Sequence, residues 1–295
     1  MPRPSIQIRS TTWDWSRPYL LGVLNVTPDS FSDGGRYARV DAAIDRAAVM
    51  VAEGVGAIDV GGESTRPGAP TIDETEELGR VIPVVEALVR RFPHPLSIDT
   101  TKASVARTAL AMGASILNDV GTGETPEALG AVAAEYGAVY VAMHARGTPA
   151  TMQSLARYDD VVREVCAELL VFVERLLAVG VPRERVVIDP GLGFAKLGAH
   201  SLSLLADLAT VRSLGYPVCV GASRKSFLVS EEAHPTGWAR DPADVDRRLG
   251  GTAAAVALAV FQGAEILRVH DVGVMQQAAR VAHSLALRSR APSAR

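Results

Sequence analysis

Short apolar segments alternate with longer amphipathic segments along the whole chain, and this alternation limits the possible folds most strongly. Residues 20–24 and 186–188 are apolar throughout, which is typical of strands covered on both faces of a sheet. Residues 41–54 instead carry apolar side chains at helical spacing and end at a glycine. The pattern predicts strands at residues 20–25, 57–62, 96–99, 115–117, 138–143, 185–188, 217–220 and 265–269, and helices at 41–54, 73–91, 102–112, 125–136, 157–179, 200–213, 247–262 and 272–288.

Eight strands that alternate with eight helices predict an α/β fold, a (β/α)8 TIM barrel made by one domain over residues 1–295. The alternation of apolar and polar residues over 5–18 predicts that residues 1–18 form a β-hairpin closing the barrel floor. Residues 231–246 are polar and are expected to form an excursion with little core, the Ala- and Val-rich helix 247–262 to be buried, and residues 289–295 to be a disordered tail. An open doubly wound sheet is the alternative, but no Gly-x-Gly-x-x-Gly pattern follows the first strand.

Charge and composition exclude several classes of protein. A net charge of −3 and a pI near 6.1 argue against a nucleic-acid partner. No run approaches the roughly 18 apolar residues that a membrane span needs, and the first residues lack the apolar core of a signal peptide. The two cysteines, Cys166 and Cys219, have no metal-site spacing and suit a reducing cytoplasm.

Polar residues follow the predicted strands at the point where each strand ends. In a (β/α)8 barrel these ends converge on one mouth, where the catalytic residues usually lie. We find neither a Cys/His metal cluster nor a recognisable Ser-His-Asp arrangement among them. In chain order the mouth is expected to receive Asn25, Glu63, Thr65, Arg66, Asp99, Asn118, His144, Asp189, Lys225, Arg268 and His270.

This set of side chains suits a planar heterocycle with hydrogen-bond donors and acceptors on its edge. A carboxylate accepts two parallel hydrogen bonds from a guanidine-like edge, and a lysine donates to a ring carbonyl or nitrogen. We expect the carboxylates, the amides and Lys225 at depth, with arginine, histidine and threonine nearer the rim. Arg66, Arg268 and His270 can hold a phosphate or pyrophosphate, and Asn25 can offer a neutral oxygen to a Mg²⁺ bound to it.

Simpler interpretations remain open for each residue taken alone. Asp99 or Asp189 can be a helix N-cap, because Asp is common there. His144 fits a structural role better than a catalytic one. Lys102 and Lys196 can be solvated, and Phe194 can belong to the core or to the rim. So many polar strand ends on one mouth are nevertheless hard to explain as caps alone.

Eight motifs, in order, make the chain resemble the bacterial dihydropteroate synthases of folate biosynthesis over essentially its whole length. The longest is GVLNVTPDSFSDGG at residues 22–35, followed by DVGGESTRPG at 59–68 and SIDTTK at 97–102. The others are NDV at 118–120, MHARGTPATMQ at 143–153, DPGLGFAK at 189–196, SRKSF at 223–227 and RVHDV at 268–272. The first two correspond to mobile loops of that family. The resemblance implies a transferase that condenses 6-hydroxymethyl-7,8-dihydropterin diphosphate with p-aminobenzoate, giving 7,8-dihydropteroate and pyrophosphate.

The resemblance also implies roles for individual residues. Catalysis would fall to Asp99, Lys225, Arg268 and Asn25, and Asn25 would serve as the protein ligand of Mg²⁺. The pterin would be bound by Asp99, Asn118, Asp189, Lys225 and a stacked Arg268. The diphosphate would be bound by Asn25, Thr65, Arg66, Arg268 and His270. The p-aminobenzoate would be bound by Phe31, Pro67, Phe194, Lys225 and Ser226.

The family mechanism is dissociative, so pyrophosphate leaves before the amine attacks. The resemblance further implies a cytoplasmic homodimer that pairs through its late helices. Two other functions are possible: a pterin-barrel methyltransferase acting on methyltetrahydrofolate and a corrinoid, and a non-catalytic relative that keeps the fold as a binding protein. The methyltransferase would have no use for the polar loops at 25–35 and 63–68, and a binding protein would be expected to show erosion in them.

Overall fold

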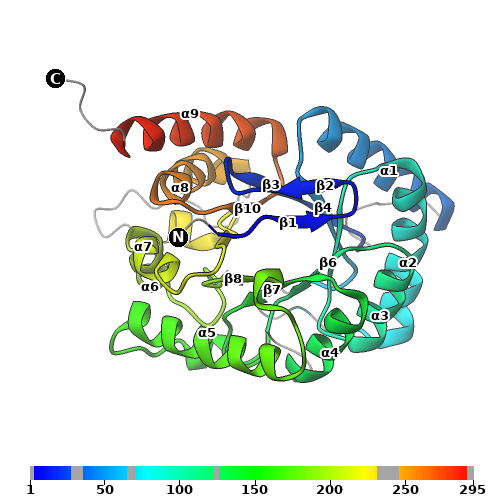
Figure 1. The fold of residues 1–295 in the computed structure, drawn as a ribbon, viewed down its shortest axis with the longest axis horizontal. Coiled ribbons are helices and arrows are strands. Elements are labelled where there is room, and N and C mark those ends of the chain that lie inside the picture. Colours follow the sequence, from blue (N-terminus) through cyan, green and yellow to red (C-terminus); the bar gives the residue numbers. More distant parts are fainter. Residues whose placement is uncertain are drawn as a thin grey trace.

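The computed structural model describes residues 3–27, 36–64, 69, 71–121, 126–230 and 246–290 (Figure 1). Eight parallel strands form one sheet in the order β8-β7-β6-β5-β4-β3-β10-β9. A parallel bridge between Ile188 and Val218 joins the two ends of this sheet, so the strands close into a barrel. The strands are β3 (Tyr19–Asn25), β4 (Ala57–Gly61), β5 (Leu96–Asp99), β6 (Ile116–Asp119), β7 (Val139–Met143), β8 (Val186–Asp189), β9 (Cys219–Val220) and β10 (Ile266–Val269).

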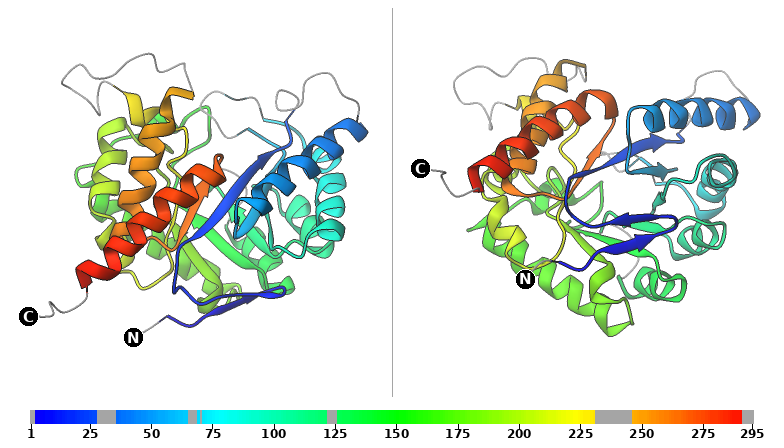
Figure 2. Two further views of the ribbon diagram at one scale, coloured as in Figure 1. Left: turned by 90° about the horizontal axis from the view of Figure 1, so that it is seen from above. Right: turned by 45° about the horizontal axis from the view of Figure 1, so that its top comes forward.

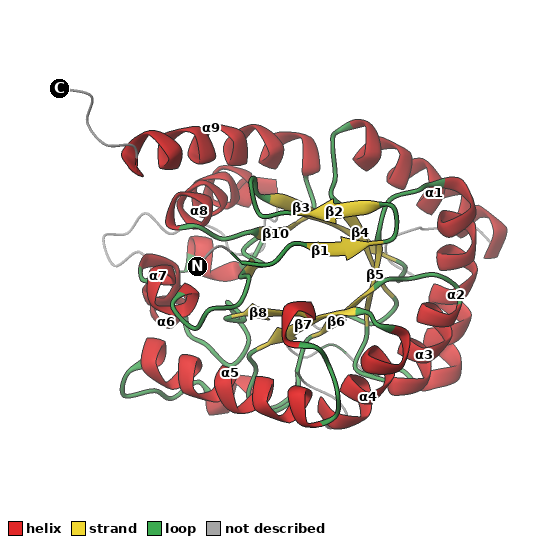
Figure 3. Ribbon diagram, in the orientation of Figure 1, coloured by secondary structure: helices red, strands yellow, loops and turns green. Residues whose placement is uncertain are grey.

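Helices follow the strands and surround the barrel, as the separate colours of helices and strands make clear (Figure 3). This arrangement confirms the predicted (β/α)8 barrel. The helices are α1 (Arg36–Ala52), α2 (Glu74–Arg91), α3 (Ala103–Ala111), α4 (Pro126–Tyr136), α5 (Val161–Ala178), α6 (Gly198–Ala206), α7 (Leu208–Arg212), α8 (Leu249–Gln262) and α9 (Val272–Arg290), with short 3-10 turns at Met152–Leu155, Arg183–Arg185, Ser226–Val229 and Asp246–Arg248.

The predicted N-terminal hairpin is present and covers one end of the barrel. Its strands β1 (Ile6–Ile8) and β2 (Thr11–Trp13) pair in antiparallel register, and the hairpin lies at the end where the barrel strands begin (Figure 2). Trp13 stacks on Tyr19 at the start of β3, with ring centroids 4.7 Å apart. The floor of the barrel is therefore sealed by apolar side chains, which leaves the opposite end for the site.

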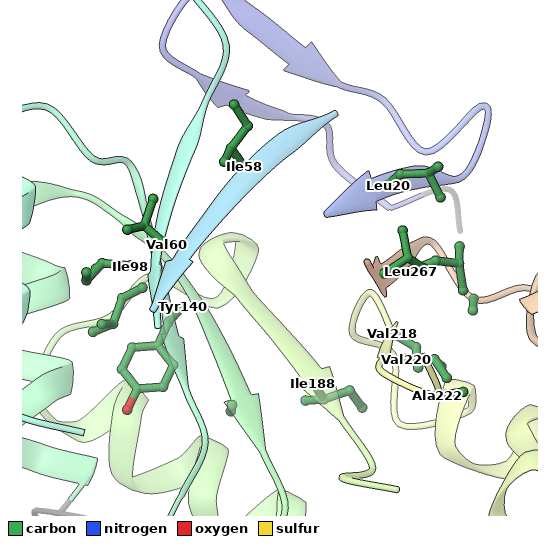
Figure 4. Packing of buried hydrophobic residues seen from close by; sticks show 14 of the residues in the cluster. Leu20, Ile58, Val60, Ile98, Tyr140, Ile188, Val218, Val220, Ala222 and Leu267 are labelled. Atoms are coloured by element: carbon green, nitrogen blue, oxygen red, sulfur yellow. The ribbon is translucent and has the colours of Figure 1, made fainter. Parts of the chain in front are cut away.

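Two apolar clusters form the core, because successive side chains of a strand point to opposite faces. The larger cluster lies between strands and helices and includes Ile58, Ile98 and Ile188 (Figure 4). The smaller cluster joins the hairpin to the lower barrel interior. Its members are Ile6, Ile8, Trp13, Tyr19, Leu21, Ala57, Ile116, Val139, Val141, Val187, Cys219 and Ile266.

Two helix predictions differ from the structure at positions set by local hydrogen bonds. The helix expected over 157–179 begins at Val161, because the Asp160 side chain accepts from the amide of Arg163 at 3.1 Å and caps it. The helix expected over 200–213 is divided into α6 and α7 at Asp207, whose backbone leaves the helical region. Neither difference moves a strand end.

The C-terminal helices differ from expectation in exposure and in length. Helix α8 buries one face, but Leu258 and Phe261 are 41% and 43% exposed, so the prediction of a buried helix was wrong. Helix α9 continues to Arg290, two residues into the expected tail, and 291–295 lie outside the described residues, as do 231–245 of the polar excursion. Among the helices in the described ranges, none is both long enough and apolar enough to cross a membrane.

Candidate active site

Alternate residues of the strands project into the barrel, and their character changes along its axis. Near the hairpin these residues are apolar, as Ile116 and Val187 illustrate. Further along several strands they are polar: Asn118 follows Ile116 on β6, and Asp189 follows Val187 on β8. The inward polar layer is buried, with Asp59 and Ser97 0% exposed, Asn118 3%, Asp189 4% and Asp99 8% exposed.

Arg268 lies within this polar layer and binds two carboxylates. Its Nε donates to Oδ2 of Asp59 at 2.6 Å, and a terminal nitrogen donates to Oδ2 of Asp99 at 2.5 Å. Asn118 Nδ2 also donates to Asp59 Oδ2, at 3.1 Å. Strands β6 and β10 are not neighbours of β4, so both contacts to Asp59 cross the barrel interior. The expectation that Arg268 lies near the rim was wrong, because these carboxylates draw its guanidinium inward.

Asp59 was not among the predicted site residues, although it receives hydrogen bonds from two of them. The available signal was a charged residue inside an otherwise apolar strand, Ala-Ile-Asp-Val-Gly. The predicted mouth was composed of residues at strand ends, whereas Asp59 lies two residues before the end of β4. Its second oxygen, Oδ1, is buried and has no partner among the described residues. A buried acceptor without a donor is costly, so Asp59 is suited to receive a ligand donor.

Burial and charge shift the pKa values of this layer. Burial raises the pKa of Asp99, and the charge of Asp59 raises it further, against the opposing effect of Arg268. Burial alone would lower the pKa of Arg268, but Asp59 and Asp99 outweigh it, so the guanidinium remains charged. Two carboxylates thus share a single cation in the dry interior, and the layer retains a capacity to stabilise positive charge.

Asp189 and Lys225 form the adjacent wall of the same space. A Cβ atom at Gly221 would lie 3.9 Å from Asp189 Oδ2, 3.9 Å from Lys225 Nζ and 3.8 Å from Arg268 Cβ, so these groups surround one point. Burial raises the pKa of Asp189 and lowers that of Lys225 to about 8. The Asp189 carboxylate opposes the shift of Lys225, and the Lys225 charge opposes that of Asp189.

Lys225 is also held by the loop that follows β8. Its Nζ donates to the carbonyl oxygen of Leu192 and lies 4.5 Å from the ring centroid of Phe194. Phe194 is half-buried, which agrees with a rim position rather than a core position. The alternative that Asp99 or Asp189 is a helix N-cap was wrong, because the N-caps of α3 and α6 are Lys102 and Leu197. One oxygen of Asp189, Oδ1, accepts from the loop amide of Gly191 at 2.7 Å.

The remaining predicted residues lie at the rim or outside the described ranges. Asn25 is half-buried at the end of β3, and its side-chain amide has no hydrogen-bond partner in the described part of the chain. His270 is half-buried beside Ser223, with 3.0 Å between Nδ1 and Oγ, and Ser226 is exposed next to Lys225. Phe31, Thr65, Arg66 and Pro67 fall outside the described residues.

His144 was expected at the mouth, and Lys102 and Lys196 were open to solvation, but all three side chains are bound elsewhere. His144 faces outward and binds Glu168 on α5, with 2.9 Å between Nε2 and Oε2, which supports its structural role. Lys196 is 3% exposed, and Lys102 binds Glu63 and Glu77 at 2.5 and 2.6 Å. Solvation is therefore excluded for both lysines.

Comparison with known proteins identifies the family. Residues 21–270 match the family of pterin binding enzymes. The chain is 44% identical to the dihydropteroate synthase of Synechocystis sp. over 96% of this chain and 95% of that protein, and 48% identical to that of Mycobacterium leprae over 89% and 91%.

Solved structures agree with this assignment. A Yersinia pestis dihydropteroate synthase in a sulfonamide complex superposes with a TM-score of 0.86 at 39% identity, covering 97% of this chain and all of that one. The Xanthomonas albilineans enzyme with 4-aminobenzoic acid gives 0.85 at 38% identity, covering 98% and 100%. On this sequence and structural agreement, the chain belongs to the dihydropteroate synthase family of pterin binding enzymes.

Proposed function

We propose that this protein condenses 6-hydroxymethyl-7,8-dihydropterin diphosphate with p-aminobenzoate to form 7,8-dihydropteroate and pyrophosphate. The observation that carries the proposal is the buried layer in which Asp59, Asp99, Asn118, Asp189 and Lys225 surround one space with Arg268. Relatives have been solved with 4-aminobenzoic acid and with 7,8-dihydropteroate. The donors and acceptors of this layer match those of a pterin edge.

The pterin would occupy the deep space and Arg268 would change partners. Asp99, Asn118, Asp189 and Lys225 would bind its ring, and the buried Oδ1 of Asp59 offers one further acceptor. The guanidinium of Arg268 satisfies Asp59 and Asp99 now, so it would leave at least one of them to stack on the ring. Asn25, Thr65, Arg66, Arg268 and His270 would hold the diphosphate, and Phe31, Pro67, Phe194, Lys225 and Ser226 the p-aminobenzoate.

A Mg²⁺ ion would fit the mouth as a partner of the substrate diphosphate. The described residues contain no cluster of three or more His, Cys, Asp or Glu side chains able to hold a metal ion. Mg²⁺ is often bound by one or two protein oxygens together with substrate phosphates and water. Asn25 offers such an oxygen, and the ion would neutralise charge on the departing pyrophosphate.

We propose a dissociative reaction at the pterin methylene. The bond between the methylene carbon and the diphosphate oxygen breaks first, and pyrophosphate leaves with the electron pair. The positive charge then spreads into the pterin, where the carboxylate of Asp99 stabilises it. The amine nitrogen of p-aminobenzoate attacks the methylene carbon and loses one proton to water. No side-chain nucleophile takes part.

Pyrophosphate release measured with and without p-aminobenzoate tests the function. The proposal expects release from dihydropterin diphosphate that depends on p-aminobenzoate and is matched by dihydropteroate formation. A methyltransferase would release no pyrophosphate, and a binding protein would bind pterin without turnover. Either result would contradict the proposal.

We also propose that the protein forms a homodimer through α8 and α9. On α9, Val274, Val281 and Leu285 are 43%, 63% and 54% exposed and share one face at spacings of seven and four. Leu258 and Phe261 are exposed on α8, which packs against α9. Exposed apolar residues gathered on adjacent helices are typical of an interface, and a second copy would cover them.

Light scattering on two variants tests the dimer. Val281→Asp places a charge in the apolar stripe and is expected to give a monomer, whereas Arg280→Asp, at an exposed position on another side of α9, should leave the dimer intact. Monomeric wild-type protein would exclude this interface.

The proposed location is the cytoplasm, which agrees with the two unpaired buried cysteines, Cys166 and Cys219.

A further inference from the structure

Lys196 is a buried lysine for which the proposed reaction gives no role. Its side chain is enclosed behind the loop that follows β8, and the residue is 3% exposed. Nζ lies 2.8 Å from Nδ1 of His144 and donates to the carbonyl oxygen of Phe194 at 2.9 Å. A lysine is rarely fully buried unless its amine is paired, because removing its charge from water is costly.

His144 connects this lysine to a carboxylate on α5. The Glu168 carboxylate, whose pKa is lowered by its contacts to His144 and Arg146, can only accept. The neutral imidazole therefore carries its hydrogen on Nε2, which lies 2.9 Å from Glu168, and accepts from Lys196 at Nδ1. Burial lowers the pKa of His144 to about 4, so the ring is neutral at pH 7. The charge of Lys196 is thus balanced by Glu168 through a neutral imidazole with a defined tautomer.

The loop that Lys196 holds carries two groups that contact Lys225. The carbonyl oxygen of Leu192 accepts from Lys225, and the ring of Phe194 lies beside the same amine. This loop rests directly on the end of β7, because a Cβ atom at Gly191 would lie 1.9 Å from the carbonyl oxygen of His144. It contains no regular helix or strand, so its shape depends on such side-chain contacts.

We propose that Lys196, held by His144 and Glu168, is a positioning residue that sets Phe194 and Leu192 against Lys225 and thereby sets the affinity for p-aminobenzoate. The inference rests on the proposed roles of Phe194 and Lys225 in binding that substrate. Lys196 itself lies behind the loop and contacts neither substrate in this arrangement.

A purely stabilising role explains Lys196 less well. Burial lowers the pKa of Lys196 to about 7, which means that the fold disfavours the charge it contains. A well-packed apolar residue often replaces a buried charge without loss of stability. The hydrogen bond to the Phe194 carbonyl, in contrast, requires a donor at this point.

Steady-state kinetics of Lys196→Met tests the proposal. Loss of this buried donor is expected to raise KM for p-aminobenzoate by up to about tenfold, which corresponds to one hydrogen bond. The affinity for the dihydropterin diphosphate and kcat should change less than KM for p-aminobenzoate, since Asp59, Asp99, Asn118 and Arg268 of the deep layer make no contact with Lys196. A merely structural defect would lower the active fraction and leave KM for p-aminobenzoate unchanged, which would overturn the proposal.

A matched pair of variants on α5 keeps the test decisive if Lys196→Met does not fold. Glu168→Gln weakens the contact to His144 and one contact to Arg146. Glu164→Gln on the same helix weakens the other contact to Arg146, does not touch His144, and keeps an oxygen for the amides of Asp159 and Asp160. Glu168→Gln should raise KM for p-aminobenzoate, and Glu164→Gln should not. Equal KM values in both variants would refute the proposal, whereas a wild-type protein that releases no pyrophosphate would instead refute the proposed function.

Discussion

Arg268 and Asp59 form an ion pair across the barrel interior, with 2.6 Å between Nε and Oδ2, although 209 positions separate them in the chain. The same guanidinium also binds Asp99. An incoming pterin carries a guanidine-like edge, so it resembles the group that these carboxylates already bind. Arg268 therefore occupies the carboxylates with a group of the same kind, and its hydrogen bonds to them must break when the ring binds.

Asp59→Asn is expected to lower the pKa of Asp99. The negative charge of Asp59 raises that pKa, and its removal also leaves Arg268 with Asp99 as its sole carboxylate partner. Both effects favour the ionised form of Asp99, so the shift should be downward, on the order of one pH unit. Carbon NMR titration of the Asp99 carboxyl measures it directly.

Asp271→Asn is the control for this titration. Asp271 binds Arg224 and takes no part in the buried layer, so the pKa of Asp99 should not move. An unchanged or higher pKa in Asp59→Asn would show that the two carboxylates do not share Arg268 in solution.

Asp99→Asn is expected to reduce kcat far more than pterin affinity. The amide keeps the shape of the carboxylate but removes the charge that faces the developing cation, which should cost about 100-fold or more in kcat. Pterin affinity should fall less than about tenfold, because hydrogen bonding is partly retained. Pyrophosphate release and calorimetry with a pterin give the two quantities.

Asp119→Asn provides the matched control for Asp99→Asn. Asp119 is buried at the end of β6 but faces outward, where it accepts from the Tyr140 hydroxyl at 2.5 Å. Its substitution should lower stability and leave kcat of the folded protein unchanged. Equal losses of kcat and affinity in Asp99→Asn would mean that Asp99 only binds the ring.

Trp13→Ala is expected to destabilise the protein without altering the site. Trp13 is 1% exposed and packs against Tyr19 at the barrel floor, so its truncation should lower the free energy of unfolding by about 3–5 kcal/mol. Chemical denaturation measures the loss, and Trp15→Ala, at a half-buried residue of the same segment, should cost less. A loss of kcat in the folded variant would contradict the separation of floor and mouth.

The barrel could be predicted from the sequence because each buried strand is marked by local apolar runs. The convergence of Asp99, Asn118, Asp189 and Lys225 followed from the fold, since parallel strands end on one mouth. The rule of polar strand ends missed Asp59, whose local signal was a charge inside an apolar strand, and it misplaced Arg268 at the rim. Their positions depend on contacts across the barrel between strands that are not neighbours, and no local pattern records such contacts.

Exposure of α8 was mispredicted for a related reason. Its sequence is apolar on nearly every side, so composition alone could not distinguish a helix buried within one chain from a helix that presents one face outward. Likewise, the sequence placed His144 among the strand-end residues of the mouth, although the two-residue alternation of β7 turns His144 toward α5.

Lys196→Met is expected to change how stability depends on pH. The folded-state pKa of Lys196 is lowered to about 7 from the usual 10.5, because burial disfavours the charge. Between these values the unfolded chain binds one more proton than the folded one, so this residue makes stability rise with pH. The free energy of unfolding of the wild-type protein should therefore rise, relative to that of the variant, by up to about 1.4 kcal/mol per pH unit between pH 7 and pH 10.

Lys102→Met is the control, because Glu63 and Glu77 outweigh burial and raise the pKa of Lys102. Lys102 is therefore protonated in both states below pH 10, and the difference between wild type and this variant should not vary with pH. Urea unfolding at pH 7, 8 and 9 provides the comparison, in which other ionisable groups cancel. If the difference in unfolding free energy between wild type and Lys196→Met also stayed constant from pH 7 to pH 9, Lys196 would keep its charge throughout. That result would require a counter-ion closer than Glu168, which acts through His144.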